Sequence, residues 1–129
     1  MRPETKEWLA KAEGDFACAL REWRARTHPN YDDLCFHSQQ CIEKYLKARL
    51  TEADQSFSKT HDLTMLLDLA LPHEPLWETL RPELTLLSGY AVMFRYPGES
   101  ATREQARVSL QHLKALRKLM RQSLGLPPK

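Results

Sequence analysis

The stretch YDDLCFHSQQCIEKYLKARL, residues 31–50, has the pattern of a helix that is apolar along one face. Small and apolar side chains recur there at intervals of four and three residues, which is the period of an α-helix. These side chains are Leu34, Ser38, Cys41, Tyr45 and Ala48, and Ile42 and Leu46 widen the strip. The spacing predicts a helix over about residues 31–52 that buries this strip against other helices.

Helical patterns also precede and follow this stretch. Residues 3–26 carry an apolar stripe at helical spacing, and Pro3 suits an early helical position because its missing N–H costs nothing there. A shorter helix follows a polar loop, with Thr60 or Asp62 as its N-cap. The central helix therefore has helical neighbours on both sides in the sequence.

Two further helices complete the pattern. Pro82 interrupts an apolar run, so a short lead-in and then a helix over about residues 81–94 are expected. The last helix begins near Ser100 or Thr102, and Gly125 stops it. Glycine is only 4 of 129 residues, and no run alternates as a strand does. The expected fold is all-α, an antiparallel helical bundle of four to five helices.

The length and charge of the chain exclude several classes of protein. A chain of 129 residues fits one domain, residues 1–129. Lys and Arg number 19 against 17 Asp and Glu, a balance too even for a protein that holds nucleic acid mainly by charge. No apolar run is long enough to span a bilayer, and the charged N-terminus is not that of a signal peptide. Three cysteines without a framework spacing fit a reducing compartment, so a cytoplasmic protein is expected.

Polar residues of the central helix are the first candidates for a binding site. They are spaced by three, four and three residues and so share one side of the helix. These residues are His37, Gln40, Lys44 and Lys47. Two ammonium groups beside an amide and an imidazole can hold a phosphate or an RNA backbone. The alternative is a solvated polar face without a ligand.

The sequence KTHDL, residues 59–63, contains the pair His61 and Asp62. A metal-dependent phosphohydrolase built on such a pair needs further ligands, which His37 and Asp68 could supply. An N-cap role for Asp62 explains the aspartate without a metal. The chain also has no glycine-rich phosphate loop. We expect neither a metal nor a cofactor.

Arg95 ends the apolar part of the sequence AVMFRYPGES. A guanidinium is always charged, and its fork of N–H groups matches a carboxylate or a phosphate. The turn Tyr96-Pro97-Gly98 stops the helix and fixes the direction of the side chain. We expect the guanidinium to point into a polar cleft and to meet the central helix at Gln40, Glu43 or Lys44. The alternative is an arginine whose stem covers apolar surface while its charge stays in water.

Three stretches occur together in a fixed order: YDDLCFHSQQCIEKYLKARL, then SKTHDLTMLL, then FRYPG. This ordered set, with KAEGDFACAL in the first helix, resembles the HEPN family of small helical domains, named for higher eukaryotes and prokaryotes nucleotide-binding. The resemblance covers nearly the whole chain. It implies an antiparallel helical bundle that usually forms dimers. Many members act with a small nucleotidyltransferase as a two-component system, often toxin and antitoxin, and others are metal-independent ribonucleases.

The ribonuclease members of this family share an arginine that is followed, after four to six residues, by a histidine. The dimer brings two such sets together in a cleft. Arg95 stands at the arginine of that pattern, but no histidine follows in the required window, which holds Ser100, Ala101 and Thr102. The next histidine is His112, far outside it. The pattern therefore lacks its general acid or base.

The residues and the resemblance together predict a non-catalytic HEPN-type binding subunit. It would form a homodimer and bind a nucleotide, an RNA or a nucleotidyltransferase partner. The candidate site residues are Arg95, Lys44, Lys47, Gln40, His37 and Glu43, with His61, Asp62 and Tyr96 as secondary candidates. Two alternatives stay open. One is a metal-independent ribonuclease that pairs Arg95 with His37 or His61, and the other is a scaffold in which Arg95 pairs with Glu43.

Overall fold

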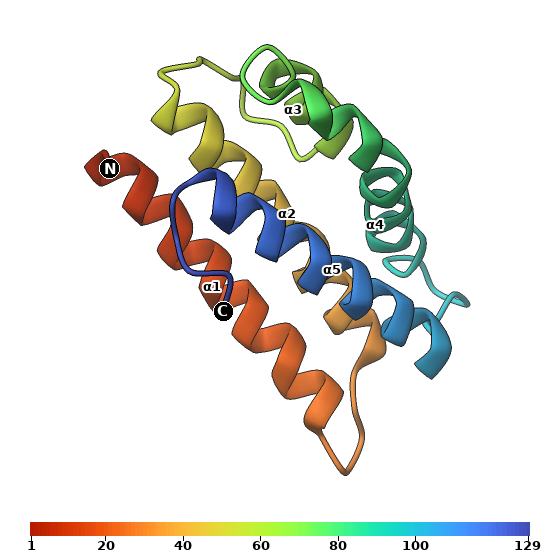
Figure 1. The fold of residues 1–129 in the computed structure, drawn as a ribbon. Helices are drawn as coiled ribbons and strands as arrows, with labels where there is room; N and C mark the ends of the chain where they lie inside the picture. Colours follow the sequence, from red (N-terminus) through yellow and green to blue (C-terminus); the bar gives the residue numbers. More distant parts are fainter.

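The computed structural model describes residues 1–129, which fold into five α-helices and one short 3₁₀ helix, η1 (Figure 1). The elements are α1 (Pro3–Arg24), α2 (Tyr31–Glu52), α3 (Leu63–Ala70), η1 (Pro75–Leu80), α4 (Arg81–Met93) and α5 (Arg103–Ser123). No strand is present, so the all-α prediction is confirmed. None of the helices has the length and apolar character that crossing a bilayer requires.

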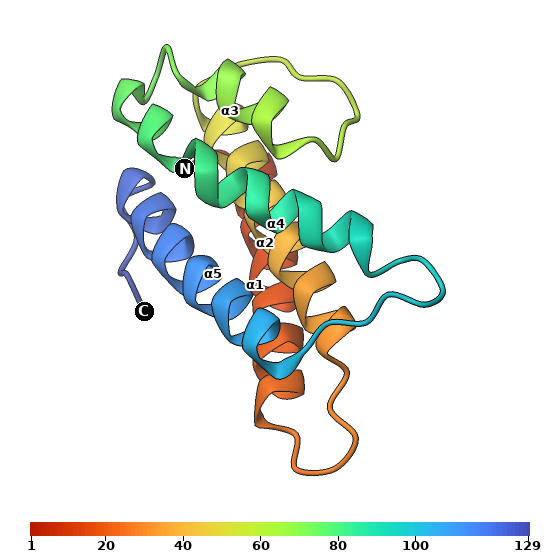
Figure 2. The same ribbon diagram turned by 90° about the vertical axis from the view of Figure 1, so that its right-hand side faces the viewer.

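The helix α2 lies at the centre of the bundle. It forms an antiparallel hairpin with α1, and α5 runs alongside α2 in the same direction (Figure 1). Figure 2 shows α4 crossing α2 on the side away from α1, with α3 near the end of α2. Helix α2 therefore contacts neighbours on several sides, and the antiparallel bundle expected from the sequence is confirmed.

The strip of α2 that was predicted to be buried has no exposed surface. Leu34, Ser38, Cys41, Tyr45 and Ala48 are each 0% exposed. The one hydroxyl among the small residues of this strip is satisfied locally, because Ser38 Oγ donates to the Leu34 carbonyl at 2.8 Å. Around the strip, one apolar cluster joins α2 to every other helix, for example through Leu66 in α3 and Leu113 in α5.

Side-chain caps fix where three helices begin. Asn30 accepts a hydrogen bond from the Asp33 amide at 2.9 Å and starts α2. Asp62, one of the two residues predicted as the N-cap of this helix, caps α3. Thr102 and Gln105 form a reciprocal capping box at the start of α5. These caps are local in sequence, which explains why the sequence alone locates the starts of α3 and α5.

The first helix ends two residues before its predicted end. It stops at Arg24, and the chain reaches a left-handed conformation at His28, with φ of 49°. Pro29 follows and disfavours helical geometry at that histidine. At the other end of the chain, Gly125 takes a φ of 73° just after α5, which confirms the glycine stop.

The lead-in expected before α4 is the 3₁₀ helix η1. Pro82 then lies in the first turn of α4, where the missing N–H costs nothing. Helix α4 ends at Met93, and the next residue, Phe94, is buried and packs its ring against Tyr90 with centroids 5.5 Å apart. Phe94 thus anchors the end of α4 and sets where Arg95 leaves the helix.

Candidate functional site

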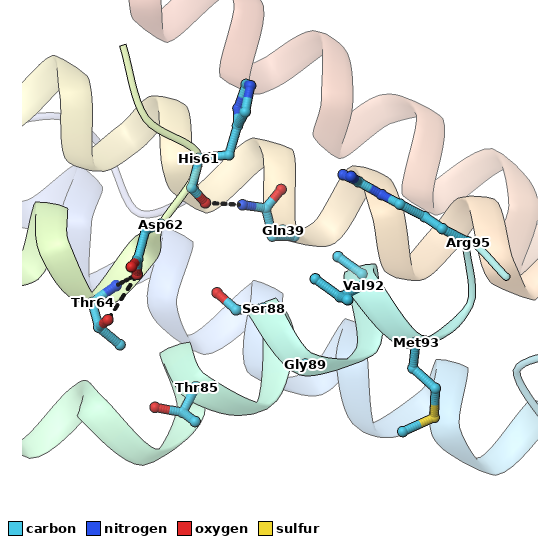
Figure 3. Close-up of a pocket in the computed structure, with 11 residues that line it drawn as sticks. Gln39, His61, Asp62, Thr64, Thr85, Ser88, Gly89, Val92, Met93 and Arg95 are labelled. Carbon is cyan, nitrogen blue, oxygen red and sulfur yellow. Dashed lines mark hydrogen bonds between the residues drawn. The ribbon is translucent and has the colours of Figure 1, made fainter. Parts of the chain in front are cut away.

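An open groove of about 690 Å³ lies beside α4 (Figure 3). One side is the face of α4, and the other sides come from α2 and from the segment that enters α3. The lining residues are Gln39, His61, Asp62, Thr64, Thr85, Ser88, Gly89, Ala91, Val92, Met93 and Arg95. A volume of this size falls in the range of small-molecule sites, which is roughly 300–1,000 Å³.

Arg95 lies at the end of this groove. The segment after it forms a turn in which the Glu99 amide donates to the Tyr96 carbonyl at 3.2 Å, with Gly98 at φ of 88°. Proline followed by a left-handed glycine is the pattern of a type II turn. The guanidinium carbon lies 5.6 Å from the centre of the Phe36 ring on α2. Arg95 therefore contacts α2 through an aromatic ring.

The sequence predicted different partners for Arg95. None of the ion pairs in the structure includes this residue, and its side chain makes no hydrogen bond. The pair with Glu43, which the scaffold alternative requires, is not formed, and Glu43 binds Lys47 and His61 instead. Gln40 and Lys44 also lie outside the groove. The expectation of contact with α2 holds, but the contact residue is Phe36.

The polar side chains of α2 do not form the free cationic face that their spacing suggested. Two of them face α1, where Asp15 binds both. His37 Nδ1 lies 2.7 Å from Asp15 Oδ1, and the Lys44 ammonium binds the other oxygen of the same carboxylate. His37 also lies 3.6 Å from Asp33 through Nε2. A carboxylate from another helix thus compensates these charges inside the fold.

Lys47 is engaged in a second buried network. Its ammonium lies 3.1 Å from Oε2 of Glu43 and 5.4 Å from the centre of the Trp8 ring. Both members of the ion pair are nearly inaccessible, with 6% exposed for Lys47 and 2% for Glu43. Gln40 donates to the side chain of its neighbour Gln39. The Lys47–Glu43 ion pair lies within α2, and Lys47 reaches α1 through the Trp8 ring. Of the residues in this network, only Gln39 lines the groove.

His61 is the candidate histidine that lines the same groove as Arg95. Its Nδ1 lies 2.9 Å from Oε1 of Glu43, and 77% of its side chain is exposed. Gln39 also donates to the backbone oxygen of His61 at 2.9 Å. Figure 3 shows the ring at the rim and the Arg95 side chain extending toward it from the other end.

Asp62 lies in the groove wall but is committed to capping α3. Its carboxylate accepts from the Thr64 hydroxyl and from the amides of Thr64 and Met65. These hydrogen bonds, led by the one from the Thr64 hydroxyl, hold the pKa of Asp62 below its usual range. The further ligands considered for a metal lie elsewhere, since Asp68 pairs with Arg81 and His37 with Asp15.

Several groove residues carried no functional signal in the sequence. Gln39 lies beside Gln40, which was chosen as a candidate. Phe36, which contacts Arg95 without lining the groove, lies next to His37. Ser88 and Gly89 are small, and Gly89, which has no side chain, lets a ligand approach the helix backbone. The Ser88 hydroxyl is buried and has no hydrogen-bond partner. Tyr96, a secondary candidate, is 63% exposed and does not line the groove.

The fold and the groove define an all-helical bundle with a small-molecule-sized site at the edge of α4. A family model described as the HEPN domain matches residues 5–123. The chain belongs to the HEPN domain family, which confirms the resemblance seen in the sequence. The family includes nucleotide-binding and ribonuclease members. No curated protein and no solved structure gives a significant match to the chain.

Proposed function

We propose that this chain is a non-catalytic binding subunit that holds the phosphate of a nucleotide in the groove beside α4. One observation carries the proposal. Arg95 is the single permanent cation among the residues that line the groove, and no carboxylate neutralises it. The other cations considered from the sequence, Lys44 and Lys47, are held by Asp15 and Glu43.

The groove suits a nucleotide in charge and shape. A guanidinium forms two parallel hydrogen bonds with a phosphate and is the side chain best matched to it. The Phe36 ring holds the guanidinium on one face, which leaves its N–H edge for a ligand. Val92 is 54% exposed and offers apolar surface for a base, and Gly89 adds no side chain beside it.

The proposed assembly is a homodimer. Besides Val92 in the groove, two exposed apolar side chains lie at the end of α4 and in the turn after it, namely Met93 and Tyr96, with 41% and 63% of their surface exposed. A second copy covering them would remove that surface from water and bring a second groove nearby. Sedimentation should give twice the chain mass at micromolar concentration, and a monomer there would contradict the proposal.

The proposed partner is a small nucleotidyltransferase, in a two-component system of the toxin–antitoxin kind. The family resemblance supports this, and an acidic surface or an RNA phosphate could also meet Arg95. The cytoplasm is the proposed location, where thiols such as the buried Cys35 and Cys41 stay reduced. A reading frame for a nucleotidyltransferase next to this one would support the partnership, and failure of the two proteins to copurify would oppose it.

Thermal unfolding with AMP and with adenosine tests nucleotide binding. A ligand that binds only the folded chain adds about 2.7 kcal/mol to the free energy of unfolding at a hundred times its Kd. AMP should therefore raise the Tm, and adenosine, which lacks the phosphate, should raise it less. Arg95→Ala should abolish the AMP effect and Arg95→Lys should weaken it, because an ammonium has no fork. Arg24→Ala, at an exposed position of α1, is the matched control.

A second candidate function has one observation in its favour. His61 lines the groove with Arg95 and is held by a carboxylate, which is how a general base is oriented. The other histidine considered, His37, is held by Asp15 outside the groove. RNA cleavage that persists in a chelator and is lost in both Arg95→Ala and His61→Gln would support a ribonuclease. The binding proposal expects no cleavage above background.

A further inference from the structure

The imidazole of His61 is held by a buried carboxylate and is nevertheless open to solvent. Its Nδ1 lies 2.9 Å from Oε1 of Glu43, which is 2% exposed, whereas the His61 side chain is 77% exposed. Gln39 donates to the His61 backbone oxygen at 2.9 Å. Both the ring and the backbone of this histidine are therefore fixed from α2.

The partners of Glu43 decide which nitrogen of the His61 ring carries the proton. Oε2 of Glu43 accepts from Lys47 at 3.1 Å, and Oε1 accepts from Gln39 at 3.2 Å. An ionised carboxylate accepts hydrogen bonds and donates none, so Nδ1 of His61 is the donor. In the neutral ring Nε2 is then a bare acceptor. It becomes a donor only when the ring takes up a second proton.

The unpartnered polar groups of the groove are Nε2 of His61, the Ser88 hydroxyl and the Arg95 guanidinium. Ser88 Oγ is buried without a hydrogen-bond partner, and Figure 3 shows it pointing from α4 into the groove. Buried polar groups are nearly always paired, so the Ser88 hydroxyl requires a polar partner, which can be a water or a ligand oxygen. An anion with several oxygens would supply acceptors here.

We propose that His61 and Arg95 together form the phosphate site of the groove, that Glu43 is the positioning residue for His61, and that the ligand is a phosphate monoester of the nucleoside monophosphate type. This inference rests on the proposed function, because it uses the same groove. The complex holds one proton between Nε2 and a phosphate oxygen. That proton is donated by the imidazolium to the dianion, or by the P–OH of the monoanion to the neutral ring.

Charge favours a monoester over a diester. A phosphate monoester carries about −1.5 to −2 charges near pH 7. Arg95 and a protonated His61 together match that charge, whereas Arg95 alone matches the single charge of a diester. The remaining groove, along Val92 and the bare backbone of Gly89, has room for the sugar and base in its volume of about 690 Å³.

The charged groups around His61 give the sign of the pH dependence. Glu43 and Lys47 of α2 compensate each other. Asp62, next in the chain, is occupied by the cap of α3, and Arg95 after α4 stays charged at every relevant pH. Of these side chains, only His61 is of a type that changes charge between about pH 5 and 8, and the phosphate monoester also changes charge near pH 6. Attraction for a phosphate dianion increases as the pH falls and the ring is protonated.

Calorimetric titration of the full chain with AMP, from pH 6 to 8, tests the inference, because histidines change charge at roughly pH 5–8. At pH values where the free ring and the free phosphate have both lost their protons, the affinity should fall about tenfold per pH unit. This is the slope expected when binding takes up one proton. Titrations in two buffers of different ionisation enthalpy should show that proton being taken up. Imidazole ¹⁵N signals of the free chain should report the Nδ1–H form.

His61→Gln should lower the affinity for AMP at pH 6 by about tenfold, as expected for one lost charged hydrogen bond, and should remove the proton uptake. His61→Asn is a second variant in case the first perturbs the fold. His112→Gln is the matched control, because this partly exposed histidine lies on α5 outside the groove. It should change neither the affinity nor the proton uptake.

The outcomes separate this inference from the proposed function. Binding of AMP that requires Arg95 but keeps its affinity and pH profile in His61→Gln would overturn the inference alone. Absence of AMP binding, or binding that is unchanged in Arg95→Ala, would overturn both. Cyclic AMP, in which the phosphate is a diester, should bind at least about tenfold more weakly at pH 6. Equal affinity for the two would overturn the assignment to monoesters.

Discussion

The contact of α1 with α2 and the groove beside α4 both contain charged side chains, but they use them differently. At the contact, Asp15 binds Lys44 and His37, and Glu43 binds Lys47. At the groove, Arg95 rests on an aromatic ring and has no carboxylate partner. The first set of charges is paired inside the bundle, and the second is available to a ligand.

This difference shows that residue type and spacing do not identify a binding cation. Lys44, Lys47 and Arg95 are all near apolar segments of the sequence. What separates them is whether a carboxylate lies within reach. Asp15 of α1 pairs with Lys44, Glu43 pairs with Lys47 from one turn earlier in α2, and no carboxylate pairs with Arg95.

The largest effect is expected from Glu43→Ala. Removing one partner of a buried ion pair leaves the other charge uncompensated and costs about 3–5 kcal/mol. Here Lys47, only 6% exposed, would lose its carboxylate. Urea denaturation measures the change. Glu104→Ala, which breaks an exposed pair with Arg107, should leave the midpoint nearly unchanged, and equal effects of the two variants would contradict this expectation.

Acid should destabilise the fold by protonating Glu13, a further carboxylate that is paired with other side chains of the protein. Burial alone would raise its pKa, but hydrogen bonds from Arg117 and Tyr45 outweigh burial and hold the pKa of Glu13 below its usual range. This stabilisation is complete above the unfolded-state pKa of about 4.3 and is lost as pH falls through the lower folded-state pKa. Urea midpoints should thus fall more steeply with acid in the wild type than in Glu13→Gln. If the midpoints of the two proteins fell in parallel with pH, the ion pair of Glu13 would not contribute to stability.

A smaller loss is expected from Asp62→Ala. Removing an N-cap aspartate costs about 1 kcal/mol, and Thr102→Ala, at the capping box of α5, should cost a similar amount. Nucleotide affinity should not depend on Asp62, because its carboxylate is occupied by Thr64 and Met65. If Asp62→Ala had normal stability but bound the nucleotide more weakly, Asp62 would belong to the ligand site.

The smallest change in stability is expected from Gly89→Leu and Gly14→Leu. A Cβ atom added at either helical position has no neighbouring atom within 4 Å, and removing a helical glycine gains about 0.5–1 kcal/mol. Only Gly89 lies in the groove. Calorimetry with AMP should show binding lost in Gly89→Leu and kept in Gly14→Leu. Retention in both would place the ligand elsewhere.

Local features of the sequence predicted most of the fold. The buried strip of α2, the cap at Asp62 and the stop at Gly125 depend on residues a few positions apart, so the sequence contains the needed information. The site was predicted only in part. Arg95 and His61 were chosen, but the anion for Lys44 comes from α1, far away in the chain. Such partners follow from packing, which spacing along one helix does not specify.

The most direct test of the central claim is an NMR spectrum of the arginine side-chain Nε–H groups, recorded with and without AMP. We expect the Arg95 signal to shift as the phosphate binds its guanidinium. The signals of two ion-paired arginines should not shift, namely Arg117, which binds Glu13, and Arg49, which binds Glu74. An Arg95 signal that does not move while AMP binds, or shifts confined to Arg117 and Arg49, would contradict the central claim.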